Sequence, residues 1–358
     1  MRAFVEVNLK AIANNINLIK SKTSAQILAV VKADAYGHGL IPVAKCAIDA
    51  GATWLGVAIL EEAITLRDAG VKAPIISWLT PPSSDFKKAI ELDIDLAIPS
   101  LKHLELVLAA GKALGKKPRV HIEVDTGMTR GGLLGEWPEF LIAIKGADLE
   151  VVGFWSHFAR ADEPNEIANQ NQVSDFESKL AELQVIGITP KYVHLANSAA
   201  ALTNAGAHKN IIRLGIAMYG LSPDVTTLGT SLELDLEPAM TLKAEIHLVK
   251  RVPAGSPVGY GGTQLTSSDT KLAIIAMGYS DGIPRNTSSA AGVFVAGRKA
   301  AIIGRVSMDQ FVVDLGPETR AKAGDYVVIF NNGAAGEFTA EDWGLASSSI
   351  NYEMTTRI

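Results

Sequence analysis

A lysine directly follows a run of apolar residues in the segment ILAVVKADAYGHG, residues 27–39. The apolar run predicts a buried strand, and burial lowers the pKa of an amine because it disfavours the charged form. A neutral amine is a nucleophile that condenses with an aldehyde to form a Schiff base. Lys32 is therefore the first candidate for covalent chemistry in this sequence.

Further polar residues stand at the ends of other strand-like runs. They are Glu123, Asp125, His157, Asn197, Ser198 and Arg213. Each one alone is more readily explained as a solvated strand end, a satisfied core histidine or half of an ion pair. As a set they indicate one ligand site, because a β/α barrel places its active site at the carboxyl ends of its strands.

Two of the following loops are built for close approach to a phosphate group. The segments ANSAA (196–200) and LGIAMYG (214–220) contain small residues, glycine and a serine hydroxyl. Barrels often hold phosphate on the loops after their seventh and eighth strands, where backbone N–H groups are free to donate. An aldehyde for Lys32 together with a phosphate site predicts pyridoxal 5'-phosphate as the cofactor.

The elements that must position these residues alternate regularly along the chain. Strand-like runs occupy residues 26–32, 54–60, 73–79, 95–100, 119–125, 150–157, 192–198 and 210–216. Amphipathic stretches separate most of them, and Asn8 is the expected N-cap of a first helix that places Leu9, Ile12, Ile16 and Ile19 on one face. Eight strand–helix repeats favour a closed β/α barrel of the TIM type over a doubly wound sheet.

The pattern of predicted secondary structure changes after about residue 230. Strand-like runs there are separated by Gly, Pro, Asn and Asp, without long helical periodicity until the end of the chain. We therefore predict a barrel over residues 8–230 and a mainly β domain over residues 231–358, joined by the strand-like residues 1–7.

Composition narrows the class of protein further. The 358 residues are 48% hydrophobic, carry a net charge of −5 and show no block of Lys and Arg, which argues against nucleic acid and anionic membranes as partners. Cys46 is the only cysteine, so an intrachain disulfide is excluded, and we predict no metal site. Without a signal-like segment or a long apolar run, the sequence predicts a cytoplasmic location.

Eight motifs in order resemble those of bacterial alanine racemases. They are AVVKADAYGHG, VDTGMTRGG, SHFARAD, HLANSAA, RLGIAMYG, PVGYGGT, GRVSMDQ and INYE, and they span essentially the whole chain. The resemblance implies a β/α barrel followed by a β domain, and the interconversion of L-alanine and D-alanine by two bases through a Schiff base with pyridoxal phosphate. It also implies a head-to-tail homodimer in which each active site joins one subunit's barrel to the other subunit's β domain.

The resemblance assigns roles to individual residues. It implies that Lys32 forms the Schiff base and acts as one base, and that Tyr260 is the opposite base, reaching in from the partner subunit. The positions that match contacts to the cofactor phosphate are Tyr36, Ser198, Gly215, Ile216 and Tyr352, and Asn197 belongs with the cofactor-binding residues.

The remaining matches surround the cofactor ring and the substrate. Arg213 faces the pyridine nitrogen, and His157 lies beside the ring, hydrogen-bonded toward the tyrosine base. Arg130 touches the phenolic oxygen of the cofactor and helps to place the substrate carboxylate, while Met308 and Asp309 line the substrate side from the partner. An arginine at the pyridine nitrogen only donates, so it would keep that nitrogen unprotonated.

Glu123 departs from the pattern of the family. Many members carry a carbamate-modified lysine there, and alternation along RVHIEVD predicts that Glu123 points into the barrel. We therefore expect Glu123 to supply a permanent carboxylate that orients Arg130 without any carbamate.

Rival functions remain open within and beyond the racemases. A broad-specificity or serine racemase would carry the same motifs. A non-catalytic pyridoxal phosphate carrier would lack the second domain, and Tyr260 with Met308–Asp309 argues against it. Basic amino-acid decarboxylases need a cysteine in the C-terminal domain, whereas Cys46 lies in the first half of the chain.

Overall fold

A computed structural model describes residues 1–358. The chain forms two compact units. One comprises Ala13–Ala35 and Gly39–Met218, and the other comprises Met1–Ile12, Tyr36–His38 and Tyr219–Ile358. None of the helices has both the length and the apolar character needed to span a bilayer.

The first unit is built on eight parallel strands that form a nearly closed barrel. They are β2 (Gln26–Val30), β3 (Trp54–Val57), β4 (Ile75–Ser77), β5 (Asp95–Ile98), β6 (Arg119–Glu123), β7 (Glu150–Trp155), β8 (Tyr192–His194) and β9 (Ile211–Leu214). Their spatial order is β8-β7-β6-β5-β4-β3-β2-β9. The predicted TIM-type barrel is confirmed, with all eight strands inside or at the edge of the predicted runs and shorter than predicted.

Side-chain and backbone bonds connect the first and last strands in this order. Asn210, just before β9, accepts from Val193 N–H at 2.7 Å and donates to the carbonyl of Lys191 at 2.7 Å. The N–H of Arg213 donates to the carbonyl of Ala196 at 3.0 Å. These bonds replace a regular ladder where β8 is too short to pair fully with β9.

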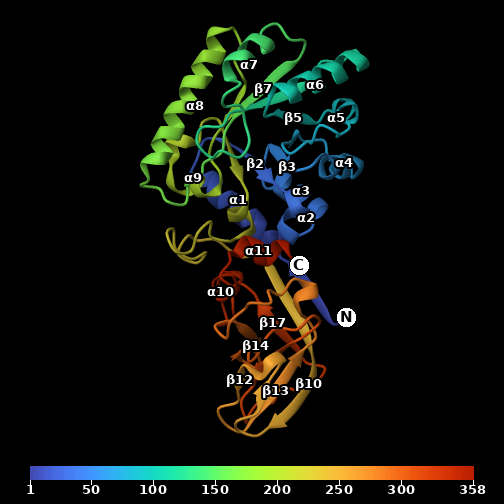
Figure 1. The fold of residues 1–358 in the computed structure, drawn as a ribbon, viewed down its shortest axis with the longest axis vertical. Coiled ribbons are helices and arrows are strands. Elements are labelled where there is room, and N and C mark those ends of the chain that lie inside the picture. The colour runs from blue at the N-terminus through green and yellow to red at the C-terminus, as the bar shows by residue number, and fades with distance from the viewer. The chain divides into compact units, whose positions relative to one another are not determined.

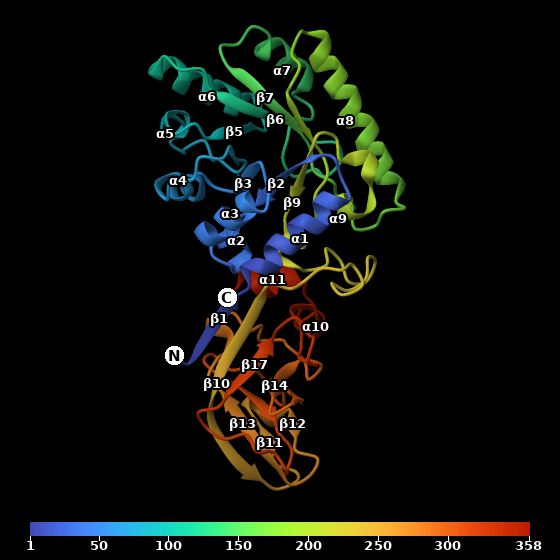
Figure 2. The same cartoon turned by 180° about the vertical axis from the view of Figure 1, so that it is seen from behind.

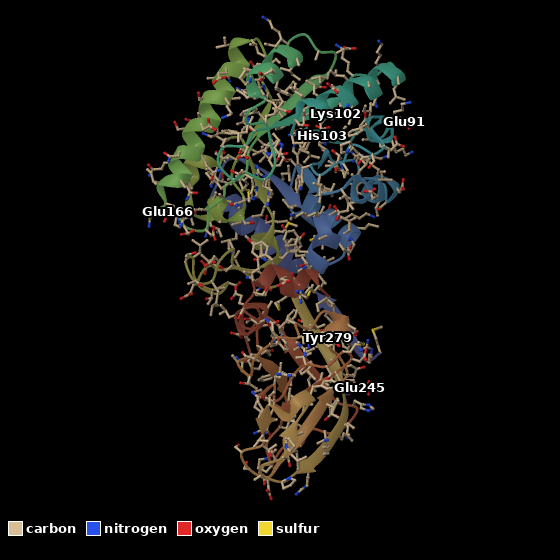
Figure 3. All side chains as sticks on the ribbon, in the orientation of Figure 1. Glu91, Lys102, His103, Glu166, Glu245 and Tyr279 are labelled. Atoms are coloured by element: carbon tan, nitrogen blue, oxygen red, sulfur yellow. The ribbon has the colours of Figure 1, made fainter.

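Helices flank the strands of the barrel unit. They are α1 (Leu9–Ser21), α3 (Leu40–Asp49), α4 (Leu60–Asp68), α5 (Phe86–Glu91), α6 (Leu101–Leu114), α7 (Trp137–Ile144), α8 (Ile167–Val185) and α9 (Ser198–Thr203), with a short turn η1 (Ala205–Ala207). Helix α8 is the long ribbon along one side of this unit in Figure 1. Charged side chains such as Glu91 on α5 and Lys102 on α6 are exposed on the outer helices (Figure 3).

Helix α1 begins where the sequence predicts. The Oδ1 atom of Asn8 accepts from the backbone N–H of Lys10 at 3.1 Å, as an N-cap does. Ile12, Ile16 and Ile19 are fully buried. The buried stripe also runs through Ala11 and Asn15, and Leu9 lies at its edge, 37% exposed.

The second unit is an antiparallel sheet of seven strands. The order β15-β14-β17-β10-β13-β16 forms one path, and β1 pairs with β10 beside it. The strands are β1 (Ala3–Val7), β10 (Met240–Val252), β13 (Thr270–Ile275), β14 (Gly292–Val295), β15 (Arg298–Ala301), β16 (Phe311–Asp314) and β17 (Tyr326–Phe330). Figure 2 shows β10 as the longest strand, with β13 and β17 beside it.

Short elements complete this unit. A hairpin of β11 (Pro257–Val258) and β12 (Gln264–Leu265) carries the turn η3 (Tyr260–Gly262) between its strands. The other elements are η4 (Tyr279–Asp281), α10 (Ala340–Ala346) and α11 (Asn351–Thr356). Pairing between β1 and β10 brings the first residues of the chain into the same sheet as its last third.

Candidate active site

Lys32 begins an unusual turn at the end of β2. The sequence predicts that the strand ends on Lys32, but β2 ends at Val30, so Lys32 lies two residues beyond the strand, at the start of α2 (Lys32–Gly37). Ala33, Asp34, Ala35 and Tyr36 have φ of +53°, +49°, +54° and +55°, which is one turn of left-handed helix. Such backbone is costly for residues other than glycine and concentrates at functional sites.

Carboxylates hold the start of this turn. Glu62 on α4 accepts hydrogen bonds from the backbone N–H groups of Ala33 at 2.6 Å, Ala58 at 3.0 Å and Ile59 at 3.3 Å. Asp34 accepts from the N–H of Leu40 at 2.6 Å. Burial and then the charge of Arg130 lower the pKa of Lys32, while Glu62 raises it in part. These effects shift Lys32 toward its neutral, nucleophilic form.

Replacing Glu62 with alanine should destabilise the protein by about 1–3 kcal/mol, because three backbone N–H groups lose their acceptor. Urea unfolding measures the free energy of unfolding. Glu61→Ala is the matched control, since Glu61 is the exposed neighbour on the same helix. Equal stabilities for the two variants would contradict the anchoring role of Glu62.

Ser198 gathers the backbone of the two small-residue loops. Its hydroxyl oxygen accepts from the N–H of Gly215 at 2.9 Å and from the N–H of Ala217 at 3.3 Å, in the turn η2 (Ile216–Tyr219). Asn197 is the N-cap of α9 and accepts from the N–H of Ala200 at 3.0 Å. Both residues were expected to end a strand, but β8 stops at His194 and the chain turns directly into α9.

Tyr36 and Tyr352 lie together in the other unit. The ring of Tyr36 stacks on Tyr219 at 4.8 Å between centroids, and the ring of Tyr352 lies 6.3 Å from it. Burial raises the pKa of Tyr36, so its hydroxyl keeps its proton as a donor. Gly37 is required beside it, because a Cβ there would lie 2.2 Å from the carbonyl oxygen of Thr355.

Arg213 is buried and fully directed by its acceptors. It donates to the backbone carbonyls of His194 at 2.9 Å, Ser156 at 2.8 Å and Leu195 at 3.1 Å. Burial lowers its pKa to about 9, which still leaves the guanidinium charged at neutral pH. Its Nη2 also lies 3.0 Å from Nδ1 of His157. The structure thus brings together two of the predicted site residues.

The state of His157 follows from this contact. A guanidinium has no acceptor, so Nδ1 of His157 must accept and Nε2 must carry the ring proton. Burial and the positive charges of Arg213, Arg130 and Lys32 lower the pKa of His157 well below its usual range. His157 is therefore a neutral ring that donates from Nε2.

The role of Glu123 in orienting Arg130 stays a prediction. No ion pair joins the two side chains, and Arg130 is exposed in the loop after β6. Burial raises the pKa of Glu123 to about 7, although the charge of Arg213 and then that of Arg130 oppose the rise. Gly131 packs closely, since a Cβ there would lie 3.0 Å from Oε1 of Glu123.

Replacing Glu123 with glutamine should impair turnover far more than folding. The pKa of Glu123 is about 7 in the folded state and lower in the unfolded chain. As the pH rises from the unfolded-state pKa to the folded-state pKa, ionisation of Glu123 therefore lowers the free energy of unfolding. The cost is on the order of 3 kcal/mol above that range, and the uncharged glutamine avoids it. Urea unfolding at pH 5 and pH 8 should show the variant gaining on the wild type at pH 8.

An activity assay distinguishes a site that uses the carboxyl of Glu123 from a site that needs a carbamate formed with carbon dioxide. If the carboxyl of Glu123 suffices, wild-type turnover should be the same in carbon-dioxide-depleted and bicarbonate-supplemented buffer. The glutamine variant should be slow in both buffers. A wild-type enzyme that needs bicarbonate, or a fully active variant, would contradict the hypothesis.

The three predicted residues from the β unit lie on turns. Tyr260 begins η3 and is 70% exposed, and Met308 is 54% exposed. The hydroxyl of Ser280 donates to Asp309 at 3.1 Å and to the carbonyl of Met308 at 2.9 Å. Tyr260 is thus largely exposed on the chain that carries it.

Two residues of this region were missed by sequence reasoning. Glu62 lies in an ordinary amphipathic segment, and its anchoring of Ala33 depends on two strands that pair only in the fold. His194, which bonds Arg213, sits inside the strand-like run 192–198. Its inward position could have been found from the alternation along that run.

Comparison with known proteins identifies the class and then the family. Residues 7–223 match the family described as alanine racemase, N-terminal domain, and residues 239–358 match alanine racemase, C-terminal domain. An alanine racemase from Salinispora tropica is 44% identical over 361 residues, covering 99% of this chain and 95% of the relative. One from Beutenbergia cavernae is 46% identical, covering 98% and 94%.

Solved structures agree with these sequence matches. Alanine racemase from D-cycloserine-producing Streptomyces lavendulae superposes with a TM-score of 0.97 at 44% identity, covering 100% of this chain and 95% of that one. The enzyme from Bacillus anthracis with bound L-Ala-P gives 0.89 at 38% identity, covering 100% and 92%. Fold and matches together define a two-domain barrel racemase of the isomerase class. The chain belongs to the alanine racemase family.

Proposed function

We propose that this chain holds pyridoxal 5'-phosphate at the carboxyl ends of its barrel strands and interconverts L-alanine and D-alanine there. The observation that carries the proposal is the amine of Lys32, whose pKa is lowered by burial, on a strained turn. The buried guanidinium of Arg213 lies in the same compact unit as Lys32, and so does Ser198 with the backbone N–H groups that it holds.

The residues present suit this cofactor. Ser198 fixes Gly215 and Ala217 by accepting from their N–H groups, and the N–H of Ile216 between them would donate to a phosphate. The family resemblance adds the hydroxyls of Tyr36 and Tyr352 as further donors. Asn197 holds the loop that carries Ser198. Arg213, charged and already aligned, would donate to the pyridine nitrogen. When bound, pyridoxal phosphate withdraws electrons and makes the Cα proton of an attached amino acid acidic.

Two proton-carrying groups on opposite faces suit a racemisation. Lys32 would remove or return a proton at one face of the substrate Cα, and Tyr260 at the other. The Nε2–H of neutral His157 can donate to the tyrosine oxygen and so favour its ionised form. Arg130 would help to place the substrate carboxylate, and Met308 and Asp309 would line the substrate side from the partner.

The exposed position of Tyr260 supports a site shared between two subunits. We propose residues 8–230 as the cofactor-bearing domain, and residues 231–358 with 1–7 as the domain that completes the active site of the partner in a homodimer. The cytoplasmic location predicted from the sequence stays a prediction.

A panel of L-amino acids with chiral detection tests the proposed reaction. Purified protein with added pyridoxal phosphate should convert L-alanine to D-alanine and back, with serine a poorer substrate. Conversion of serine or larger amino acids at equal rates would replace alanine racemisation by a broad-specificity activity. Binding of the cofactor without any racemisation would favour a non-catalytic carrier.

A further inference from the structure

A line of polar side chains runs through the barrel interior, starting at the end opposite the candidate active site. Asp95 begins β5, Arg119 begins β6, and His121 follows on β6; His194 ends β8. Asp95, His121 and His194 are at most 1% exposed. Nothing in the proposed chemistry uses these three residues directly, so their burial requires a separate reason.

The line is continuous at hydrogen-bonding distance. Arg119 donates to the two carboxylate oxygens of Asp95 at 2.8 Å and 3.1 Å. Asp95 Oδ2 lies 3.2 Å from Nε2 of His121, and Nδ1 of His121 lies 2.9 Å from Nε2 of His194. Nδ1 of His194 lies 3.2 Å from Nη1 of Arg213. The chain of bonds therefore ends at the arginine of the candidate site.

Only one arrangement of protons satisfies every contact. Arg213 can only donate, so Nδ1 of His194 accepts and Nε2 of His194 carries the proton. That proton is donated to Nδ1 of His121, whose own proton must then be on Nε2 and point at Asp95. Asp95 must be ionised, because it receives this proton as well as those from Arg119.

A second proton on either histidine would break the line. A proton on Nδ1 of His194 would face the guanidinium of Arg213, and one on Nδ1 of His121 would face the Nε2–H of His194. Burial and the charge of Arg213 lower the pKa of His194 well below its usual range, which agrees with a neutral ring. All donors thus run in one direction, from Arg213 to Asp95.

Neighbouring residues leave the two rings little freedom to turn. Gly153 on β7 makes room for His121, since a Cβ there would lie 2.0 Å from Nδ1. Trp54 packs edge-on against His121 at 5.2 Å between ring centroids. Trp155 lies parallel to His194 at 5.8 Å, and the guanidinium of Arg213 lies 5.0 Å from the Trp155 ring.

We propose that Asp95, His121 and His194 are positioning residues. The carboxylate of Asp95, held by Arg119, fixes the tautomers of His121 and His194, so that Nδ1 of His194 is the acceptor that faces Arg213. The ionised Asp95 makes His194 an acceptor, and this fixes which N–H groups of Arg213 remain for the candidate site. Through the same guanidinium it fixes His157 as a donor from Nε2. The effect on turnover rests on the proposed function, whereas the histidine tautomers do not.

The first test reads the tautomers directly. Nitrogen-15 NMR of histidine-labelled holoenzyme should show both His121 and His194 in the Nε2–H form, with the signals assigned from His121→Gln and His194→Gln. A doubly protonated ring, or an Nδ1–H tautomer for either residue, overturns the proposal. This reading stays valid even if the protein fails to racemise alanine.

The second test removes the acceptor. In Asp95→Leu, at least one of the two rings should leave the Nε2–H form, and kcat should fall about 10-fold or more with KM changed far less. Asp95→Asn keeps one acceptor oxygen and should retain more activity than the leucine variant. Asp93→Asn is the control, because Asp93 lies two residues away with a side chain that is 70% exposed.

A third variant disturbs the line without removing a polar group, in case Asp95→Leu does not fold. Gly153→Ala should push the His121 ring aside, change its tautomer signal and lower kcat. Gly135→Ala is matched to it, because a Cβ at Gly135 meets no atom within 4 Å. Wild-type kcat and unchanged histidine signals in a folded Asp95→Leu or Gly153→Ala protein overturn the proposal.

Discussion

Replacing Lys32 with alanine should abolish racemisation, with a loss on the order of 10³-fold or more, because both the covalent attachment and one base disappear. The variant should also lose the visible absorption band of protein-bound pyridoxal phosphate. The variant should still fold, because the left-handed turn and its hydrogen bond from Ala33 N–H to Glu62 do not involve the amine of Lys32.

Absorbance and mass spectrometry after borohydride reduction measure the attachment. Wild-type protein should carry the reduced cofactor on the peptide that contains Lys32. Lys45→Ala is a matched control, because Lys45 is an exposed lysine on the nearby helix α3. A Lys32→Ala protein that still holds a borohydride-fixed cofactor would show that another residue forms the bond.

Replacing Tyr260 with phenylalanine should lower kcat by about 10²–10⁴-fold, the range for loss of a general acid or base. Cofactor absorbance and unfolding should change little, because the tyrosine ring is 70% exposed on a hairpin turn. Tyr326→Phe is the control: its side chain is also partly exposed in the β unit, and its hydroxyl donates to the carbonyl of Met1. Kinetics with both alanine enantiomers provide the measurement.

Mixing the two inactive variants tests whether sites are shared between subunits. A heterodimer of Lys32→Ala and Tyr260→Phe chains has one site with both residues intact and one with neither. Random exchange at equal amounts should restore about a quarter of wild-type activity, since half the dimers are mixed. If verified heterodimers stay inactive, Lys32 and Tyr260 do not meet across an interface.

Local patterns in the sequence were enough to predict the barrel and the β sheet. Apolar runs bounded by turn residues marked all eight parallel strands, and the cap at Asn8 marked the first helix. Both signals act over a few residues, so they survive without knowledge of the fold. Strand ends were predicted too long because buried apolar residues continue into loops, as Val31 does after β2.

Residue type and order in the sequence also identify the candidate residues. The polar ends of the strand-like runs selected Lys32, His157 and Arg213, and the structure brings the last two within 3.0 Å. The catalytic and binding roles of these residues stay predictions until the variants are measured. The sequence can supply such a set of residues because the chemistry of a side chain is a property of its residue type.

Only the tertiary structure decided how these side chains are held. Ala33 and Tyr36 have no intrinsic preference for left-handed backbone, so the turn after Lys32 depends on a carboxylate from another strand–helix unit. Asp95, the acceptor at the far end of the line from Arg213, is distant in sequence and meets His121 only because β5 and β6 pair. Burial likewise moved the pKa of Glu123 to about 7, against the permanent carboxylate expected from its residue type. Desolvation and long-range hydrogen bonds are properties of the packed barrel, and no local pattern encodes them.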